Sequence, residues 1–493
     1  MTTALLLALA LAAPAHAPDV TTIARPTSTE WFGLYLLGKK AGYSQSWVGI
    51  EKRDGRRVLV ARSKTVLSAT VGTRSVERSQ ADEKVYEARP GGRLLAFSSR
   101  RDGDGGNRTV EGTCTAEGCT VLLVAEGQRE ERKLPPLHDT AEQADGARLA
   151  ALTGTSLKGE QLDLEALRVK QVEDRFVGRE RVAAAGVSAE VAIVEEKEEG
   201  DRAPSRVAVA RDGRIVELRL GDAVIARAEP EETARRLDRV DLFALTRVKL
   251  GGSLPRTVPG SIRYRIRGLP AEFQAVDPRQ TWSDGGDGAV ALTVVARHPA
   301  AADPKRDPPR ARGGGTPSAD EFLRSTPDVD ADHPRIRALA REVVGSEPGV
   351  YGAAVKIERE VYRRLEKAYG VSRDRASEVL TLGKGDCTEH ALLFTALARA
   401  AGVPTRQVHG LVFASYEDGV PAMYWHAWVE VKAGDEWIAL DPTFGQAVAD
   451  PTHIALGRGT QVDTVGLLGA IEILSADAAP VPRADQANAA RGG

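Results

Sequence analysis

The first half of the chain alternates between apolar and polar residues in short runs, which glycines and charged turns separate. Residues 33–37, 58–61, 120–124 and 214–218 are examples. A period of two residues places every second side chain on the same face, as in a strand with one buried face. The pattern predicts a β-rich N-terminal domain of antiparallel strands over residues 18–235.

Two further apolar runs, residues 262–266 and 289–295, predict a second, smaller β unit over residues 236–300. The chain then becomes rich in proline, glycine and charged residues, and the apolar period stops. This composition is typical of a linker or a long loop. We place a Pro/Gly-rich linker at residues 301–327.

The last third of the chain changes to a helical pattern and then returns to strands. Residues 334–344 and 350–369 carry apolar side chains at helical spacing. The strands expected after them lie at residues 405–413, 423–431, 436–440 and 467–474. Helices followed by an antiparallel sheet indicate an α+β domain, which we place at residues 328–475. Residues 476–493 are expected to form a disordered tail.

The length of 493 residues is too great for one ordinary core, so a multidomain protein is expected. The 67 Lys and Arg residues nearly balance the 69 Asp and Glu residues, which leaves a net charge of −2. A chain of this balance has no excess of basic residues with which to bind polyanions. The charge therefore gives no reason to expect a nucleic-acid partner.

Residues 1–17 combine an apolar run with the sequence Ala15-His16-Ala17, which fits a cleavage site. This combination predicts a signal peptide. Because no Lys or Arg precedes the apolar run, a buried N-terminal helix is the alternative. No later run reaches the roughly 20 apolar residues that span a bilayer, so no membrane span is expected after signal removal. The predicted location is periplasmic or secreted.

The chain has three cysteines. Cys114 and Cys119 flank a turn-like sequence, so they are predicted to form a disulfide bond across a hairpin in an oxidising compartment. Two free, inert thiols are the alternative. Cys387 is then left over, and an unpaired cysteine of this kind is a candidate for a free reactive thiol.

Cys387 opens an apolar helix. Asp386 fits the N-cap position and Glu389 fits the third helical position, which together form a capping box. Cys387 is then the first helical residue, where unpaired N–H groups and the helix dipole favour an anion. The two neighbouring carboxylates oppose a thiolate, so a nearby cation such as an imidazolium is needed.

A hairpin of the following strands can supply that cation. A four-residue loop at residues 432–435 would pair His426 directly with Asp441 on the neighbouring strand. Cross-strand partners have Cβ atoms about 5 Å apart, so Asp441 could hold the imidazole while its other nitrogen faces Cys387. A three-residue loop would turn one strand over and separate the two side chains.

Each of these residues also has a simpler structural explanation. Cys387 could be a small core residue, His426 a satisfied polar residue and Asp441 a turn acid before proline. Their combination favours nucleophilic catalysis. A metal site formed by Cys387 and His390 is a further alternative, but no second pair of cysteines lies near it in the sequence. No metal or cofactor is therefore predicted, and His409 and His453 are interpreted as structural residues.

The C-terminal part of the chain resembles the transglutaminase-like superfamily, which has a papain-like cysteine-protease architecture. The resemblance covers roughly residues 332–474. It rests on the segments GDCTEHA at residues 385–391, RAAGVPTR at 399–406, HAWVE at 426–430 and WIALDPT at 437–443. The resemblance implies a nucleophilic thiolate at Cys387, a general base and acid at His426 and an orienting carboxylate at Asp441.

The resemblance further implies thiol-dependent acyl transfer on protein or peptide amides through a thioester, with amine transfer or amide hydrolysis as the outcome. The substrate could belong to the cell envelope. Family members often use a Trp or Gln side chain as a second oxyanion donor, and residues 344–386 contain neither. Tyr351 or Tyr369 could replace it. The alternative function is an inactive binding or scaffold protein that retains the fold.

Overall fold

The computed structural model describes residues 19–479, except residues 72–73, 105, 126–127, 185–186, 202, 253, 255–257, 312–319, 370–374, 416–419 and 460–463. The predicted signal peptide at residues 1–17 lies outside this part of the chain. So do residues 480–493 of the predicted tail.

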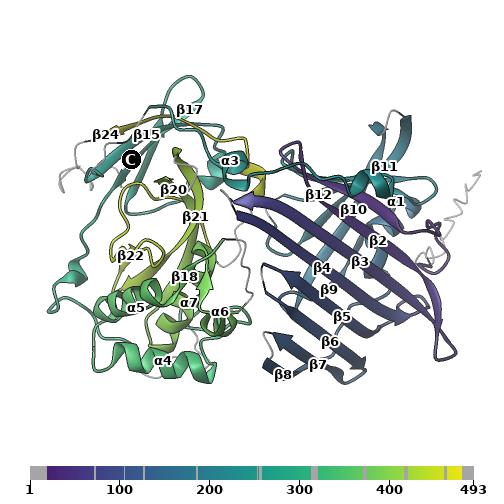
Figure 1. Ribbon diagram of the computed structural model, residues 1–493, viewed down its shortest axis with the longest axis horizontal. Coiled ribbons are helices and arrows are strands. Elements are labelled where there is room, and N and C mark those ends of the chain that lie inside the picture. The colour runs from purple at the N-terminus through teal and green to yellow at the C-terminus, as the bar shows by residue number, and fades with distance from the viewer. Residues whose placement is uncertain are drawn as a thin grey trace, which may run out of the picture.

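The N-terminal part of the molecule is one antiparallel sheet of fourteen strands (Figure 1). The strand order is β8-β7-β6-β5-β4-β3-β2-β1-β14-β13-β12-β11-β10-β9. All neighbours follow each other in the sequence except β1 and β14, so β1 joins two meanders side by side. This sheet confirms the predicted β-rich N-terminal region.

The bounds of these strands are β1 Glu30–Leu36, β2 Lys39–Arg53, β3 Arg56–Val71, β4 Arg74–Glu87, β5 Leu94–Gly103, β6 Arg108–Thr115, β7 Gly118–Ala125, β8 Gln128–Leu134, β9 Leu157–Asp163, β10 Arg168–Ala184, β11 Val187–Glu198, β12 Ser205–Ala210, β13 Ile215–Leu220 and β14 Val224–Ala228. Helix α1 (Gly146–Thr153) packs its buried Ala150 and Ala151 against apolar residues of β11 and β12.

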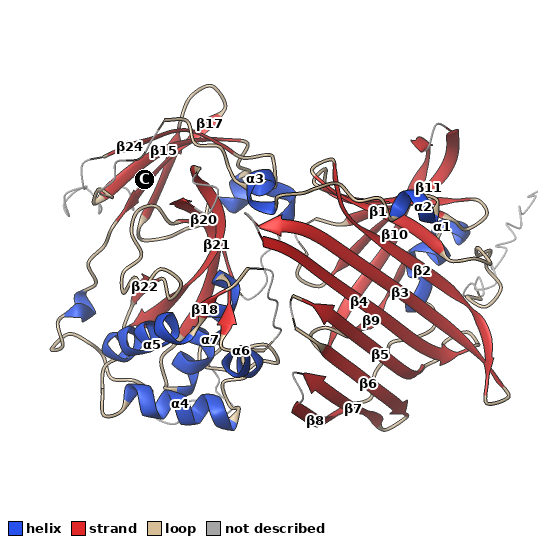
Figure 2. Ribbon diagram, in the orientation of Figure 1, coloured by secondary structure: helices blue, strands red, loops and turns tan. Residues whose placement is uncertain are grey.

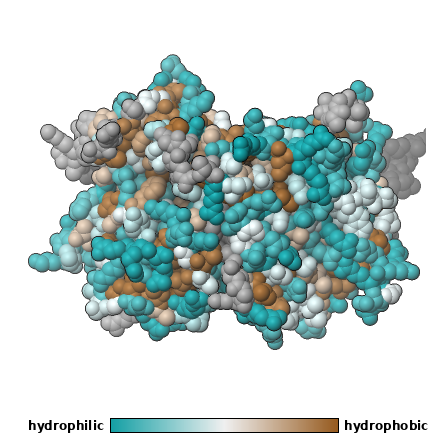
Figure 3. Space-filling model, in the orientation of Figure 1, coloured by the Kyte–Doolittle hydropathy of each residue, from teal (hydrophilic) through white to brown (hydrophobic). Residues whose placement is uncertain are grey.

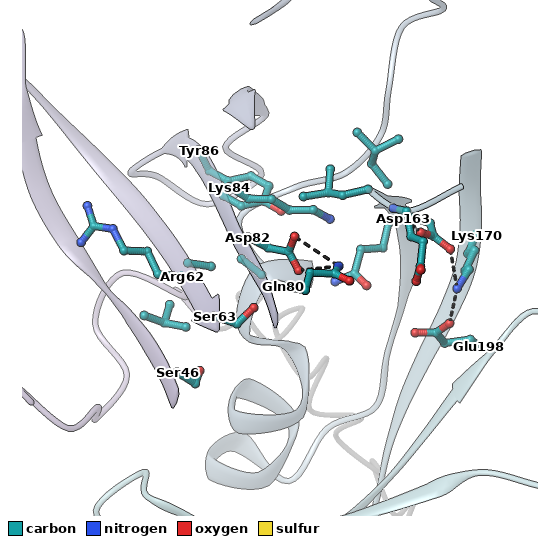
Figure 4. A pocket seen from close by; sticks show the side chains of 17 residues that line it. Ser46, Arg62, Ser63, Gln80, Asp82, Lys84, Tyr86, Asp163, Lys170 and Glu198 are labelled. Carbon is teal, nitrogen blue, oxygen red and sulfur yellow. Dashed lines mark hydrogen bonds and ion pairs between the residues drawn. The ribbon is translucent and has the colours of Figure 1, made fainter. Parts of the chain in front are cut away.

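Strands from both meanders face a polar cavity of about 390 Å³ (Figure 4). Asp82 on β4 is hydrogen-bonded to Gln80 on one wall. On the other wall, Lys170 on β10 lies 2.7 Å from Asp163 and 2.8 Å from Glu198. The sheet is therefore curved, because side chains from distant strands line the same space.

The predicted disulfide bond is present. Cys114 on β6 and Cys119 on β7 are direct partners across the hairpin, with Cα atoms 4.1 Å apart. Of the three cysteines, Cys387 is the free one.

The second, smaller β unit contains a strand from the far end of the chain. Its order is β16-β17-β15-β24, with β15 Ser261–Arg267, β16 Gln280–Asp284, β17 Ala289–Val295 and β24 Glu472–Ala478. The predicted tail is thus wrong for residues 476–478, which pair with the open edge of β15. The strand expected at residues 467–474 begins later, at Glu472, because Val465–Leu467 forms a 3-10 turn.

The predicted linker is also corrected in part. Asp307 accepts hydrogen bonds from the backbone N–H groups of Tyr351 (2.9 Å) and Gly352 (2.8 Å). Arg310 donates to the carbonyl of Glu347 at 2.8 Å. The charged residues of this Pro-rich tract therefore bind the start of helix α5 (Val350–Arg364), instead of remaining a free tether. The three glycines at residues 313–315 fall outside the described residues.

The remaining elements form the expected α+β region, with helices gathered beside a four-stranded sheet (Figure 2). The sheet order is β22-β21-β20-β23. The strands are β20 Thr405–Ser415, β21 Pro421–Ala433, β22 Glu436–Leu440 and β23 Ile454–Arg458. The helices besides α5 are α4 Pro334–Val344, α6 Ala376–Leu382 and α7 Cys387–Ala400, and a short parallel pair joins β18 (Glu366–Lys367) to β19 (Lys384–Gly385).

Helix α7 is the centre of this region. Its residues 389–399 are all buried, so the helix is covered on every side. It contacts α4, α5 and α6 as well as β20 and β21. The small sheet adds a second buried cluster, in which Ile262 and Ile473 meet Leu411 and Ile454.

Helix α3 (Leu242–Thr246) connects the large sheet to the C-terminal region. The segment before it bridges β3 through Thr70 and Asp241, and the segment after it bridges β21 through Val248 and Met423. A second contact between the two regions is the ion pair of Glu130 with Arg375, 2.9 Å apart. The two regions consequently lie side by side in Figure 1.

The face of the molecule in Figure 3 is mostly hydrophilic, with hydrophobic residues in small scattered groups. Within the described residues, none of the helices combines the length and the apolar character that crossing a membrane would require.

Candidate active site

Cys387 is the first residue of α7, and the predicted capping box is confirmed. The Asp386 carboxylate accepts from the Thr388 N–H at 2.9 Å. The Glu389 carboxylate accepts from the Asp386 N–H at 3.0 Å. These bonds fix the start of the helix and hold the thiol at its N-terminal end.

The helix start was expected to favour a thiolate at Cys387, but the surroundings of the residue have the opposite effect. Burial raises the pKa of the thiol well above its ordinary value, and the charge of Asp386 adds to the rise. A hydrogen bond from the backbone N–H of Ala427 lowers the pKa but does not compensate. Because Cys387 keeps partial exposure, solvent moderates the rise. The resting thiol is therefore protonated near neutral pH, and the helix start alone does not ionise it.

His426 on β21 and Asp441 after β22 are in direct contact. His426 Nε2 lies 2.8 Å from Asp441 Oδ2. The other oxygen of Asp441 accepts from the backbone N–H groups of Thr443 (2.7 Å) and Phe444 (3.1 Å). Burial would raise the pKa of Asp441, but His426 and a second histidine, His453, hold it well below its ordinary range. Asp441 is thus an ionised acceptor with a fixed orientation.

The predicted register of this hairpin is wrong by two residues. Val431 pairs with Ile438, and the loop is a two-residue turn with Gly434 at a φ of 63°. Glycine tolerates this left-handed conformation, so a tighter turn forms than we expected. Asp441 leaves the ladder after Leu440. A shift of two residues keeps every side chain on its face, so Asp441 still reaches His426.

The other nitrogen of the His426 ring is the one left for chemistry. Among the described residues, Nδ1 of His426 has no hydrogen-bond partner. The ring stacks on Phe444 with centroids 4.8 Å apart and planes at 11°. The Cys387 sulfur accepts a hydrogen bond from the backbone N–H of Ala427, which directly follows His426 on β21. Cys387 therefore lies next to the part of β21 that carries His426. The structure therefore brings His426 and Asp441 into contact, and it brings Cys387 to the adjacent backbone without a hydrogen bond to the ring.

His453 is a site residue that the sequence analysis interpreted as structural. It directly precedes β23, a strand that was not predicted although residues 454–456 are apolar. Its Nε2 lies 3.0 Å from the same Asp441 oxygen that His426 contacts. Its Nδ1 lies 3.2 Å from both the carbonyl and the carboxylate of Asp450. The ring is completely buried.

His426, Asp441 and His453 each offer one atom that could bind a metal ion, and these atoms lie within 4.8 Å of one another. However, both rings approach a single carboxylate oxygen at hydrogen-bond distances, so we describe the three as hydrogen-bond partners. The alternative metal site at Cys387 and His390 gains no support, because neither residue belongs to a group of three or more possible ligands among the described residues.

The two tyrosines considered as oxyanion donors lie in different places. Tyr351 donates its hydroxyl hydrogen bond to the carbonyl of Ala447 at 3.1 Å, so that group is already engaged. Tyr369 follows β18, the strand that runs parallel to β19 directly before Cys387. Its ring meets Phe243 edge-on at 4.9 Å. Of the two, Tyr369 is the one on the segment that flanks the nucleophile.

Glu358 on α5 is a second residue that the sequence did not reveal. It is 5% exposed, and burial raises its pKa to about 7, with the charge of Asp441 as the next cause. On the same helix, Tyr351 contacts Ala447 and Tyr362 packs against Gly445. Glu358 therefore lies on the helix that covers the loop after Asp441.

Similar proteins cover parts of the chain. An uncharacterised protein of Haemophilus influenzae is 29% identical over 102 residues, which are 20% of this chain and 27% of that protein. The chain thus matches about a quarter of the length of this relative.

A candidate cysteine protease from Cytophaga hutchinsonii has a similar structure, with 19% identity, a TM-score of 0.29 and coverage of 45% of this chain and 84% of that one. A β-barrel-like protein of unknown function from Brucella abortus has 12% identity, a TM-score of 0.31 and coverage of 41% and 94%. At these scores, neither likeness supports a statement about activity.

The match to a known family falls on the region that holds Cys387, His426 and Asp441. Residues 337–442 match the transglutaminase-like superfamily. This span contains α5 to α7 and β20 to β22 entirely. The α+β region of this chain therefore contains a transglutaminase-like superfamily domain.

Proposed function

We propose that this protein is a thiol-dependent acyl-transfer enzyme that acts on protein or peptide amides. One observation carries the proposal: His426 Nε2 is bound to Asp441 at 2.8 Å, which leaves Nδ1 as the available base beside Cys387. A nucleophile, a base and a group that orients the base are the parts that nucleophilic catalysis requires.

In the proposed reaction, Nδ1 of His426 takes the thiol proton while Sγ of Cys387 bonds to the amide carbon. The carbonyl π electrons move to oxygen. When they return, the C–N bond breaks and the imidazolium of His426 gives its proton to the departing amine. A thioester remains on Cys387. Water or a second amine attacks the thioester carbon and loses a proton to His426. The C–S bond then breaks, the acyl group leaves as a carboxylic acid or a new amide, and the Cys387 sulfur takes the proton back from His426.

The developing oxyanion needs hydrogen-bond donors. The first N–H groups of a helix lack partners within the helix. In α7, the Asp386 carboxylate already accepts hydrogen bonds from the backbone N–H groups of Thr388 and Glu389, so these two groups are occupied. The Cys387 N–H is then the first proposed donor. Tyr369, on the segment that pairs with the residues before Cys387, is the residue we propose to examine for the second one.

We also propose that the protein is exported and meets its substrate in the periplasm or outside the cell. The bond between Cys114 and Cys119 supports an oxidising compartment. A protein or peptide of the cell envelope is a substrate consistent with this location.

The test compares wild type with Cys387→Ala and His426→Ala. One assay measures incorporation of a fluorescent primary amine into a glutamine-rich protein, and the other measures ammonia or peptide release from the same protein. We expect wild type to perform one of the two reactions, with a loss of at least a hundredfold in each variant. Equal rates in wild type and Cys387→Ala would rule out the proposal.

A binding or scaffold protein is the second candidate, because the pKa of the Cys387 thiol is raised and residues 344–386 contain neither Trp nor Gln. Alkylation with iodoacetamide separates the two. For the enzyme, His426→Ala should slow alkylation of Cys387 at pH 7 to 8 by tenfold or more. For the scaffold, the rate should not depend on His426.

A further inference from the structure

We propose that His453 is a positioning residue of the candidate active site, which remains an imidazolium protonated at both ring nitrogens and holds the Asp441 oxygen that His426 contacts. The inference deepens the proposed function and rests on it. It explains why a second buried histidine lies against the carboxylate that orients His426.

Both ring nitrogens of His453 face hydrogen-bond acceptors. Nε2 faces a carboxylate oxygen of Asp441 at 3.0 Å. Nδ1 faces the backbone carbonyl oxygen and a carboxylate oxygen of Asp450, both at 3.2 Å. All three oxygens are acceptors, and a neutral imidazole has only one N–H. A neutral ring would therefore direct one nitrogen lone pair at an oxygen lone pair, although the ring is completely buried.

The charges around His453 agree with this assignment. Burial lowers the pKa of His453, but its bonds to Asp441 and Asp450 and the attraction of both carboxylates raise it overall. The pKa of each carboxyl group lies well below its ordinary value. The other ionisable groups that act on this cluster are His426, with ring centroids 5.8 Å apart, and Arg279, which donates to the Asp450 carbonyl at 2.8 Å. Tyr264 interacts with the charge of Asp450, and the charge of Asp441 acts on Cys387, His390 and Glu358. Two carboxylates thus contact the His453 ring, and a neutral imidazole could donate to only one of them.

The partners of His453 are themselves fixed. Asp450 accepts from the Gln446 side chain at 2.9 Å and from the Thr452 N–H at 2.8 Å. Gln446 in turn exchanges two backbone hydrogen bonds with Asp441, of 2.8 and 2.9 Å. Residues 441–453 therefore form a closed loop. Within it, His453 ties the carboxylate of Asp441 to the carboxylate of Asp450.

This arrangement has two consequences for His426. The shared oxygen must accept from both rings, so neutral His426 carries its proton on Nε2 and presents the Nδ1 lone pair. The positive charge of His453 also offsets part of the negative charge of Asp441. Without it, the full negative charge of Asp441 would act on His426 and on the nearby Cys387 thiol, whose pKa that charge already raises.

The first experiment detects the protons directly. Protein labelled with ¹⁵N-histidine is examined by NMR between pH 6 and 9, and His453→Gln assigns the signals of His453. We expect two ring N–H groups on His453 at every pH up to at least 8. A single ring N–H at pH 7 would overturn the proposal.

The second experiment measures alkylation of Cys387 as a function of pH in His453→Gln. Glutamine can place an amide donor near the position of Nε2 but carries no charge. The midpoint is the pH at which the alkylation rate of Cys387 reaches half its maximum. We expect it to move upward by about one pH unit, because the charge that offsets Asp441 is lost. The matched control is His409→Gln, because Nε2 of His409 on β20 donates to the Gly459 carbonyl (3.1 Å) and does not contact Asp441. Its profile should coincide with that of wild type.

Neither experiment requires a substrate, so the two proposals can fail separately. A wild type that is alkylated at Cys387 but transfers no acyl group would contradict the proposed function only. A His453→Gln profile that coincides with wild type would contradict the role of His453 only. If His453→Gln does not fold, the number of ring N–H groups on His453 is still measured on wild type. Its signals are then assigned by elimination, from variants of the other histidines.

Discussion

Single residues of the candidate site are held by unusually complete hydrogen bonding. The buried Asp441 carboxylate receives bonds from two imidazoles, His426 and His453, and from two backbone N–H groups, those of Thr443 and Phe444. A carboxylate with these partners stays ionised and cannot rotate. The orientation of His426 therefore depends on one side chain.

Asp441→Asn should test this dependence. An amide has one acceptor oxygen, so its NH2 group must face either the two imidazoles or the backbone N–H groups of Thr443 and Phe444. In both orientations hydrogen bonds are lost, and no negative charge remains to hold the His426 imidazolium. We expect kcat to fall by about 10²- to 10⁴-fold, as in comparable triads, with KM changed little. Steady-state kinetics on whichever amide substrate wild type accepts provides the measurement. Near-UV circular dichroism confirms that the variant is folded, and unchanged kcat would contradict the orienting role.

Glu358→Gln should change stability. Burial raises the pKa of Glu358 to about 7, so the carboxyl group resists ionisation in the folded protein. The folded state consequently loses stability as pH rises from about 4.5 to 7, and the full cost applies above pH 7. Removing this charge should increase the free energy of unfolding by up to about 3 kcal/mol at pH 8 and by little at pH 4.5. Urea unfolding at both pH values measures the difference. A variant less stable than wild type at pH 8 would show that the carboxylate has a stabilising partner.

Sequence reasoning identified Cys387, His426 and Asp441 but not His453 or Glu358. The first three lie in local patterns: a helix start, a strand and the end of the next strand. The significance of His453 depends on its contact with Asp441 across a loop, and that of Glu358 depends on its burial and on the charge of Asp441. Neither property leaves a periodic signal near the residue itself.

At the scale of elements, α7 and its capping box determine where the thiol lies. The box could be predicted because all its parts fall within residues 386–389. The register of β21 and β22 could not, because loops of two or four residues both keep His426 and Asp441 on compatible faces. The turn at Gly434 decided between them.

Asp386 has two effects: it caps helix α7, and its charge raises the pKa of Cys387. Two substitutions separate these effects. Asp386→Ala should cost about 1 kcal/mol of stability, because the N-cap is lost. Asp386→Asn should retain the cap and most of the stability. Both remove a negative charge that raises the pKa of Cys387, so both should speed alkylation at pH 7. Thermal unfolding and alkylation rates measure the two effects. Slower alkylation in Asp386→Asn would contradict the electrostatic contribution.

At the scale of the whole molecule, α3 connects the large sheet to the α+β region. Phe243 on α3 meets Tyr369 at 4.9 Å and Tyr424 at 5.7 Å, both edge-on. The Trp425 side chain donates to the Thr246 carbonyl at 3.0 Å. Tyr424 and Trp425 directly precede His426 on β21, so movement of the large sheet would reach the candidate base.

Phe243→Ala should weaken this coupling. Two aromatic contacts would be lost, so we expect the calorimetric unfolding of the full chain to broaden or split into two transitions. Glu130→Ala is the matched control, because it removes the same ion pair from its 43% exposed partner and leaves Arg375 bound to Asp330, so it should cost less than about 1 kcal/mol. A Phe243→Ala profile identical to that of the control would show that α3 does not couple the regions.

The return of β24 to the edge of β15 means that the transglutaminase-like domain is an insertion. The small sheet supplies strands on both sides of residues 337–442 in the sequence. Excising the domain at residue 328 would separate β24 from its neighbour and leave apolar residues such as Ile473 uncovered. The smallest piece that preserves this sheet extends from residue 261 to residue 478, so β15 and β24, two strands far apart in the sequence, set the limits of the structural unit that holds the transglutaminase-like domain.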